Sequence, residues 1–153
     1  MPGIHEVRRL PYSAEQMFDL VADVSRYGEF LPWVKATRVR SDTEDELIAD
    51  MLVGFSAIRE KFTSRVEKRR PEEIRVHYVD GPLRDLDNRW LFRTLGPQEC
   101  EIDFTVDFAF RNALFEKLAG QYFDRAFHKM VAAFEMRAAE LYGSNSSSAT
   151  SAA

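Results

Sequence analysis

The segment from Glu99 to Phe110, ECEIDFTVDFAF, places an apolar residue at every second position. Such alternation predicts a β-strand with one buried face and one wet face, which is typical of antiparallel sheets. After Asn112 the apolar residues recur at intervals of three and four to about Tyr142, which predicts one long amphipathic helix that ends at Gly143. The chain must therefore bury one face of a sheet against one dominant helix.

Weaker alternation upstream predicts six more strands. We expect them at residues 5–9, 34–40, 47–55, 58–69, 74–78 and 89–95. Ser13, with Gln16 at capping-box spacing, predicts a short helix between the first two of these strands. The segment DLDNR, Asp85 to Arg89, has the carboxylates and amide of a cation site but lacks the glycine and glutamate of a calcium loop. We interpret it as a polar turn.

The order of these elements predicts an α+β fold with a curved antiparallel sheet of about seven strands wrapped around a long C-terminal helix. A helix of about 30 residues is roughly 45 Å long but only about 10 Å wide. Seven strands spaced about 4.8 Å apart form a much wider sheet. The sheet must therefore curl around the helix, and any space that side chains leave unfilled becomes an elongated apolar cavity.

The stretch YGEFLPW, Tyr27 to Trp33, gathers four large apolar side chains in a segment where Gly28 and Pro32 oppose regular structure. It follows the short helix directly. One interpretation places these aromatic residues at the opening of the cavity. The alternative is that they complete the core.

Composition limits the class of protein. With 153 residues, 45% of them hydrophobic and 30% charged, the chain has the balance of one globular domain. Its net charge of −4 gives no basic field for DNA, and its single cysteine, Cys100, excludes an internal disulfide. Neither a signal peptide nor a run long enough to cross a bilayer is present in the sequence. We expect a cytoplasmic protein, with peripheral and transient contact with the inner membrane as its only membrane association.

Several blocks of sequence, in order, resemble the coenzyme Q-binding START-domain family, part of the polyketide cyclase/START-like superfamily that also includes the bacterial ribosome-association toxin. The resemblance runs from about Ile4 to Gly143. Its blocks are YSAEQMFDLVADVSRYGEFLPW (12–33), GFSAIREKFTSRV (54–66), DGPLRDLDNRWLF (80–92), IDFTVDFAFRNALFE (102–116) and FDRAFHKMVAAFEMRAAELYG (123–143). It implies the helix-grip fold for residues 1–143, a START-like ligand-binding domain. The Ser/Ala-rich tail 144–153 lies outside it and is predicted to be disordered.

The resemblance also implies a function. For the quinone-binding branch it implies non-catalytic binding of the polyprenyl quinone ubiquinone, in support of respiration as a lipid carrier or chaperone. For the toxin branch it implies binding to the large ribosomal subunit and blocking of subunit association. The sequence does not separate the two, and a START-like cyclase is a further alternative.

If a quinone binds, its ring needs stacking and hydrogen bonds and its tail needs long apolar walls. Alternation and helical spacing predict which aromatic and methionine side chains face inward to supply them. They are Tyr27, Phe30, Trp33, Phe55, Tyr78, Trp90, Phe92, Phe104, Tyr122, Phe123, Phe127 and Met130. The same residues would serve as ordinary core in a protein without a ligand.

One local basic cluster occurs in the chain. Arg59, Lys61, Arg65 and Arg69 alternate along one strand face. One interpretation is a solvated face paired with acidic neighbours. The alternative is a contact for ribosomal RNA or anionic lipid headgroups, which salt would weaken.

Enzymatic signatures are absent from the sequence: it has no GxSxG, HExxH, GxGxxG or P-loop motif. The three histidines stand far apart, and His128 shares a helical face only with Asp124, which we interpret as a surface pair. We therefore predict no catalytic residues, no metal, and no cofactor apart from ubiquinone as a bound ligand.

Overall fold

The computed structural model describes residues 3–55 and 57–143, without the side chain of Phe55. The predicted quinone contact of Phe55 and the predicted disorder of residues 144–153 lie outside the described residues, so both stay predictions.

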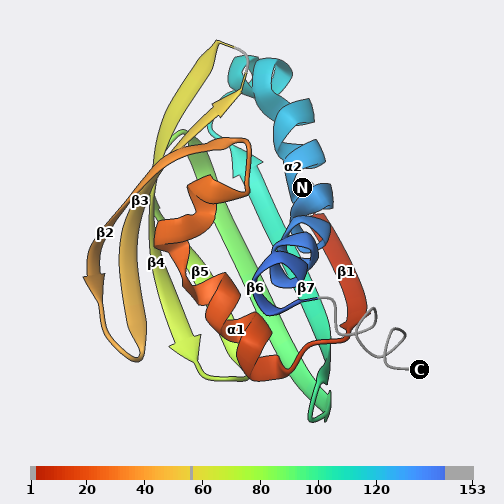
Figure 1. The fold of residues 1–153 in the computed structure, drawn as a ribbon. Helices are drawn as coiled ribbons and strands as arrows, with labels where there is room; N and C mark the ends of the chain where they lie inside the picture. The colour runs from red at the N-terminus through yellow and green to blue at the C-terminus, as the bar shows by residue number, and fades with distance from the viewer. Residues whose placement is uncertain (1–2, 56, 144–153) are drawn as a thin grey trace.

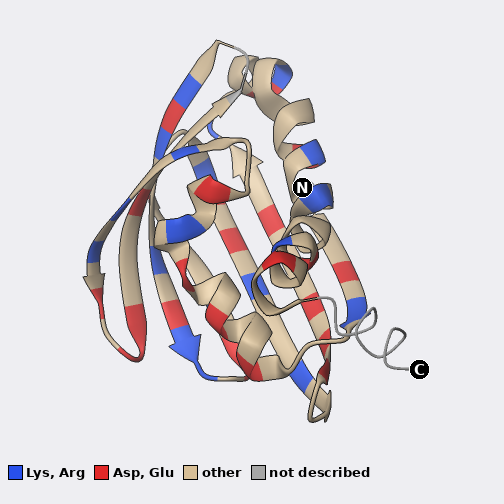
Figure 2. Cartoon of the chain, viewed as in Figure 1, with Lys and Arg blue, Asp and Glu red and all other residues tan. Residues whose placement is uncertain are grey.

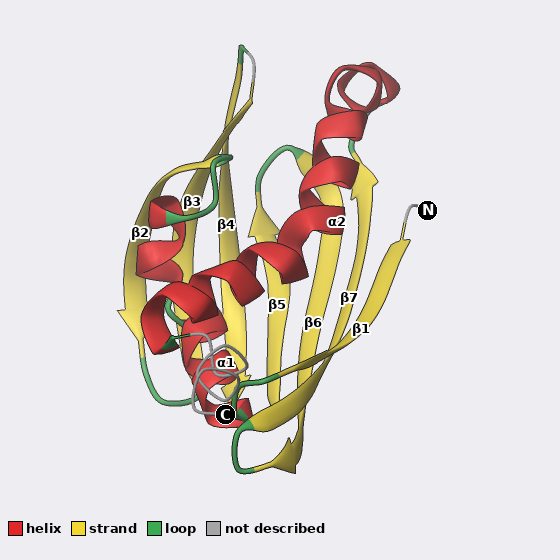
Figure 3. Cartoon of the chain, turned by 45° about the vertical axis from the view of Figure 1, so that its right-hand side comes forward, coloured by secondary structure: helices red, strands yellow, loops and turns green. Residues whose placement is uncertain are grey.

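Seven strands, two α-helices and one 3-10 helix make up this part of the chain. They are β1 (Gly3–Leu10), α1 (Ala14–Ala22), η1 (Val24–Glu29), β2 (Val34–Asp42), β3 (Glu46–Phe55), β4 (Ile58–Arg69), β5 (Glu73–Asp80), β6 (Leu83–Gly96), β7 (Glu99–Phe110) and α2 (Ala113–Tyr142) (Figure 1). Every neighbouring pair of strands is antiparallel, in the order β1-β7-β6-β5-β4-β3-β2. The sheet curves, and α1, η1 and α2 lie on its concave side (Figure 3). The predicted α+β helix-grip arrangement is confirmed.

Local chemistry sets the ends of both α-helices. The Ser13 hydroxyl accepts a hydrogen bond from the Gln16 backbone N–H, and the Gln16 side chain accepts one from the Ser13 backbone N–H, so the predicted capping box is present. The Asn112 side chain accepts from the Phe115 backbone N–H at 2.7 Å and starts α2. Gly143, with φ at 78°, ends α2 in a conformation that favours glycine.

The strand β7 is the centre of the core. It pairs with β1 on one side and with β6 on the other. Its inward side chains are almost fully buried, as the alternation predicted: Cys100, Ile102, Phe104, Val106 and Phe108.

Cys100 is expected to be inert in the folded protein. Burial, followed by the nearby carboxylates of Glu99 and Glu15, raises the pKa of the Cys100 thiol to about 11. Because the thiolate is the reactive form, alkylation by iodoacetamide should be negligible at pH 8 in the native state and fast after unfolding in guanidinium. Mass spectrometry of the two samples measures the difference. Full modification of the native protein within minutes would contradict this assignment.

The interpretation of Asp85–Arg89 as a polar turn is wrong, because these residues lie within β6. Their polarity comes from the wet outer face of the sheet. Asp87 receives two hydrogen bonds from Arg75, at 3.2 and 3.0 Å. On the inner face, the Asn88 amide donates to the Thr105 carbonyl at 3.0 Å. In sequence, such a polar strand looks like a turn. The residues that pair with it lie on neighbouring strands, far away along the chain.

None of the helices in the described ranges is both long and apolar enough to cross a membrane.

Candidate functional site

A cavity of about 150 Å³ lies between the concave face of the sheet, α2 and the segment that follows α1. Its walls come from β3, β4, β5 and β6, and from α1, η1 and α2. No histidine, cysteine, carboxylate or basic side chain is among its lining residues. The cavity therefore suits an apolar group and offers no acid–base pair.

Seven of the predicted ligand residues line this cavity. They are Tyr27, Trp33, Tyr78, Trp90, Phe123, Phe127 and Met130. Tyr27 and Trp33 belong to the stretch YGEFLPW, whereas Leu31 of the same stretch is 1% exposed in the core. The stretch thus contributes residues both to the cavity wall and to the core, and the location of the cavity's opening stays a prediction.

The structure places four other predicted residues elsewhere. Phe92 and Phe104 contact Trp90, with ring centroids 6.3 and 4.6 Å away, and are buried in the core without reaching the cavity. Phe30 packs edge-on against Phe134 and does not line the cavity. Tyr122 lines a neighbouring pocket. Alternation indicates that a side chain faces inward, but it does not show whether other side chains fill the space in front of it.

Most of the wall that sequence reasoning missed is aliphatic. These residues alternate along β3, β4 and β5 or follow the helical spacing, so their inward direction was predictable. The sequence-based prediction favoured aromatic residues as ligand contacts and therefore omitted them. The missed residues are Val21, Val24, Ala49, Met51, Val53, Phe62, Ser64, Val66, Ile74, Val76, Leu86, Asn88, Ala126 and Phe134.

Three polar side chains of the wall, those of Tyr27, Tyr78 and Asn88, form hydrogen bonds within the protein. The Tyr27 hydroxyl donates to the Val21 carbonyl, and burial raises the pKa of Tyr27 far above its usual value. The Tyr78 oxygen accepts from the Leu83 backbone N–H at 2.8 Å, and burial likewise raises the pKa of Tyr78. Asn88 accepts a hydrogen bond from the Trp90 indole at 3.1 Å. Both phenols are neutral at physiological pH and serve as hydrogen-bonding groups.

A second pocket, of about 320 Å³, adjoins the cavity. We call it the outer pocket. The two share Trp33 and Ala126, so any passage between them runs beside these side chains. The other residues around the outer pocket are Pro32, Lys35, Gly54, Tyr122, Arg125 and Lys129.

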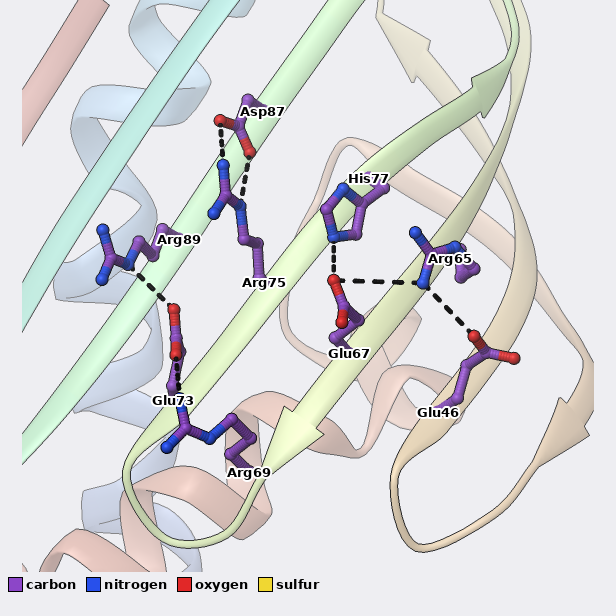
Figure 4. Close-up of polar contacts among 9 residues, drawn as sticks. All are labelled: Glu46, Arg65, Glu67, Arg69, Glu73, Arg75, His77, Asp87 and Arg89. Atoms are coloured by element: carbon purple, nitrogen blue, oxygen red, sulfur yellow. Dashed lines mark hydrogen bonds and ion pairs between the residues drawn. The ribbon is translucent and has the colours of Figure 1, made fainter.

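Two of the four residues in the predicted basic cluster on β4 are paired with acids. Figure 4 shows Arg65 beside Glu46 at 3.3 Å and Arg69 beside Glu73 at 3.3 Å. The network of ion pairs continues over β5 and β6, where Arg89 contacts Glu73 at 2.9 Å. Lysines, arginines and carboxylates are interspersed across the strands (Figure 2).

The other two members of the cluster differ from this pair. Lys61 lies near Asp50, whose pKa is lowered chiefly by a hydrogen bond from Thr63 and also by Arg40 and Lys61. Arg59, at the start of β4, donates to the Ile58 carbonyl at 3.3 Å and has no ion-pair partner among the described residues.

The histidines do not build a catalytic or metal site in the described residues. His128 and Asp124 form the predicted surface pair at 3.5 Å, and both are more than half exposed. His5 contacts Asp103, and His77 contacts Glu67. The described ranges contain no group of three or more His, Cys, Asp or Glu side chains that could hold a metal ion.

Comparisons with known proteins agree with this geometry. Residues 10–135 match the family described as polyketide cyclase / dehydrase and lipid transport. The Ribosome association toxin RatA of Escherichia coli (strain K12) is 38% identical over 142 residues, which cover 93% of this chain and 90% of the toxin. The Coenzyme Q-binding protein COQ10 homolog B, mitochondrial, of Xenopus laevis is 35% identical and covers 90% of this chain, which spans 58% of that relative.

A solved structure shares the fold. A START superfamily protein from Mycobacterium smegmatis superposes with a TM-score of 0.74 over 91% of this chain and 98% of that protein, at 17% identity. Because the family match covers residues 10–135, most of the chain, the protein belongs to the polyketide cyclase / dehydrase and lipid transport family.

Proposed function

We propose that the protein binds a polyprenyl quinone, ubiquinone, without changing it chemically. The observation that carries the proposal is the cavity, whose wall consists almost entirely of aliphatic and aromatic side chains. The name of the Xenopus relative supplies the class of ligand. Such a protein would take up its ligand from the cytoplasmic side of the inner membrane and carry or protect it there.

The size of the cavity determines how such a ligand would sit. A cavity of about 150 Å³ accommodates a group the size of benzene. A polyprenyl quinone is much longer, so its remaining atoms would extend past Trp33 and Ala126 into the outer pocket. Each buried CH2 of the tail would contribute roughly 0.8 kcal/mol. The Tyr78 oxygen accepts from Leu83, which leaves its own proton for a quinone carbonyl.

The lining residues favour binding over catalysis. A cyclase of this fold would need groups that move protons, and general acid–base catalysis uses side chains such as histidine, carboxylates or lysine. None of these lines the cavity; two tyrosines, which can also transfer protons, do line it, and both are hydrogen-bonded within the protein. We therefore place the cyclase alternative behind quinone binding.

Binding to the large ribosomal subunit, with blocking of subunit association, is the second candidate function. The match to the Escherichia coli Ribosome association toxin favours it, because that match covers 90% of the toxin, against 58% of the quinone-binding relative. Co-sedimentation with purified large subunits, with and without small subunits, tests this candidate separately.

Extraction of the protein from its native host with organic solvent, followed by mass spectrometry, is the direct test of the proposal. We expect a quinone at near-stoichiometric yield. If the protein carries no quinone and purified ubiquinone in detergent also fails to bind it, the proposal is refuted.

Ala126→Trp should close the passage between the cavity and the outer pocket. The indole would fill space beside Trp33, so we expect at least a tenfold weaker affinity for ubiquinone, the equivalent of losing about two buried CH2 groups. Ala36→Trp adds the same ring at an exposed position on β2 and should bind as the wild type does. Equilibrium titration of both variants in detergent measures the difference. Equal affinities would show that the ligand does not use this passage.

A further inference from the structure

The N-terminal half of α2 presents an apolar stripe to solvent. Leu114 is 69% exposed, Leu118 is 59% exposed and Tyr122 is 37% exposed. Each helical residue advances by about 100°, so these three side chains fall on one face within an arc of roughly 80°. Soluble proteins rarely leave large apolar side chains such as Leu114 and Leu118 exposed next to one another on a helix face.

Two cations continue the same face. Arg125 and Lys129 lie within the same arc, and the stripe with its cations extends for about 22 Å along the helix. Both line the outer pocket, together with Lys35 from β2. No carboxylate is among the residues that line this pocket. Figure 2 shows basic positions along this part of α2.

These cations differ in their ion pairing from the arginines on the outer face of the sheet. There, Arg65, Arg69 and Arg75 each contact a carboxylate. In the described residues, no carboxylate lies within ion-pair distance of Arg125 or Lys129. Within the described part of the chain, Lys35 donates only to a backbone oxygen, the Pro32 carbonyl, at 2.9 Å. These cations are available for an external anion.

We propose that this surface docks on an anionic phospholipid bilayer. We call it the docking face, and it consists of Leu114, Leu118, Tyr122, Arg125, Lys129 and Lys35. The leucines would enter the boundary between headgroups and acyl chains, and the cations would contact lipid phosphates. An RNA partner would use the cations but would leave the leucines without a role, so the bilayer accounts for both features.

Docking in this orientation would hold the outer pocket against the membrane surface. An apolar ligand could then pass between the bilayer and the cavity with little exposure to water. The inference goes beyond the proposed function, because the docking face is complete without any ligand in the cavity.

Flotation of ligand-free protein with vesicles tests the inference. One set of vesicles contains phosphatidylcholine alone, and the other also contains phosphatidylglycerol. We expect binding to the anionic vesicles, weakened by salt. The double variant Arg125→Gln/Lys129→Gln should lose affinity for them on the order of 30-fold, since each cation near an anionic surface contributes about fivefold. Arg9→Gln/Arg93→Gln makes the same charge change on exposed strand positions and should bind as the wild type does.

A second pair of variants tests the leucines. Leu114→Ser/Leu118→Ser should weaken vesicle binding by about tenfold or more, because apolar area no longer enters the bilayer. Met136→Ser/Leu141→Ser removes exposed apolar side chains from the other half of α2 and should have no effect.

Three outcomes would overturn the inference. The first is absence of wild-type binding to anionic vesicles. The second is an equal loss in test and control variants. The third is an unchanged affinity in the leucine variant together with loss of ribosome co-sedimentation in the Arg125→Gln/Lys129→Gln variant, which would assign the surface to RNA phosphates. Quinone titration in detergent is unaffected by any of these outcomes, so failure of docking and failure of the proposed function are distinguishable.

Discussion

Trp90→Ala is expected to lower the free energy of unfolding by about 3–5 kcal/mol, the range for removal of a large aromatic side chain from a core. Trp90 is 3% exposed. Its ring centroid lies 4.6 Å from that of Phe104 on β7 and 5.1 Å from that of Phe134 on α2. The indole thus joins the sheet to the long helix, and alanine would leave both neighbours facing empty space beside an existing cavity.

Urea denaturation followed by circular dichroism measures this loss. Trp90→Phe is the matched variant, because it keeps an aromatic ring between Phe104 and Phe134 and removes only the smaller ring of the indole, with the N–H that donates to Asn88. We expect it to lose clearly less stability than Trp90→Ala. A loss below about 1 kcal/mol for Trp90→Ala would mean that neighbouring side chains collapse into the space, and that Trp90 does not hold the helix on the sheet.

Phe127→Asp is expected to weaken ubiquinone binding by at least about 100-fold, because an ionised carboxylate in an apolar cavity must be desolvated or kept apart from the ligand. Phe127 lines the cavity, and its ring centroid is 5.0 Å from that of Phe108. The side chain is only partly buried, so the fold has room to hydrate the new carboxylate when no ligand is bound.

Tryptophan fluorescence measures this affinity without a label. The chain has two tryptophans, Trp33 and Trp90, and both line the cavity, so a bound quinone should quench the emission. Met136→Asp introduces the same charge at a residue of α2 that is 70% exposed, and it should titrate as the wild type does. Met130→Asp is a second variant in the cavity wall, useful if Phe127→Asp proves unstable. Normal quenching in a folded Phe127→Asp protein would show that the quinone does not bind in the cavity.

Much of the fold was predictable because its signals are local. The alternation of Glu99–Phe110 and the capping box of Ser13 and Gln16 each concern a few neighbouring residues, and both are confirmed. The segment Asp85–Arg89 was misinterpreted because the partners that make it a strand, on β5 and β7, are distant in sequence.

The candidate site was predictable only in part, for a related reason. Sequence patterns give the direction of a side chain, so Trp90, Phe92 and Phe104 were all predicted to face inward, and all three are buried. Which of them reaches open space depends on how closely α2 approaches the sheet above each one. Cross-strand register likewise determines whether an arginine such as Arg65 meets a carboxylate, and that register is a tertiary property.

The cavity and the tightest part of the core occupy different halves of the sheet. No residue of β1 or β7 lines the cavity, whereas β3, β4 and β5 supply much of its wall. Exchanges of side-chain size on β3, β4 and β5 can therefore reshape the binding space while β7 and its partners keep the domain folded. We therefore expect the range of molecules that the cavity accepts to be set by the side chains of these three strands.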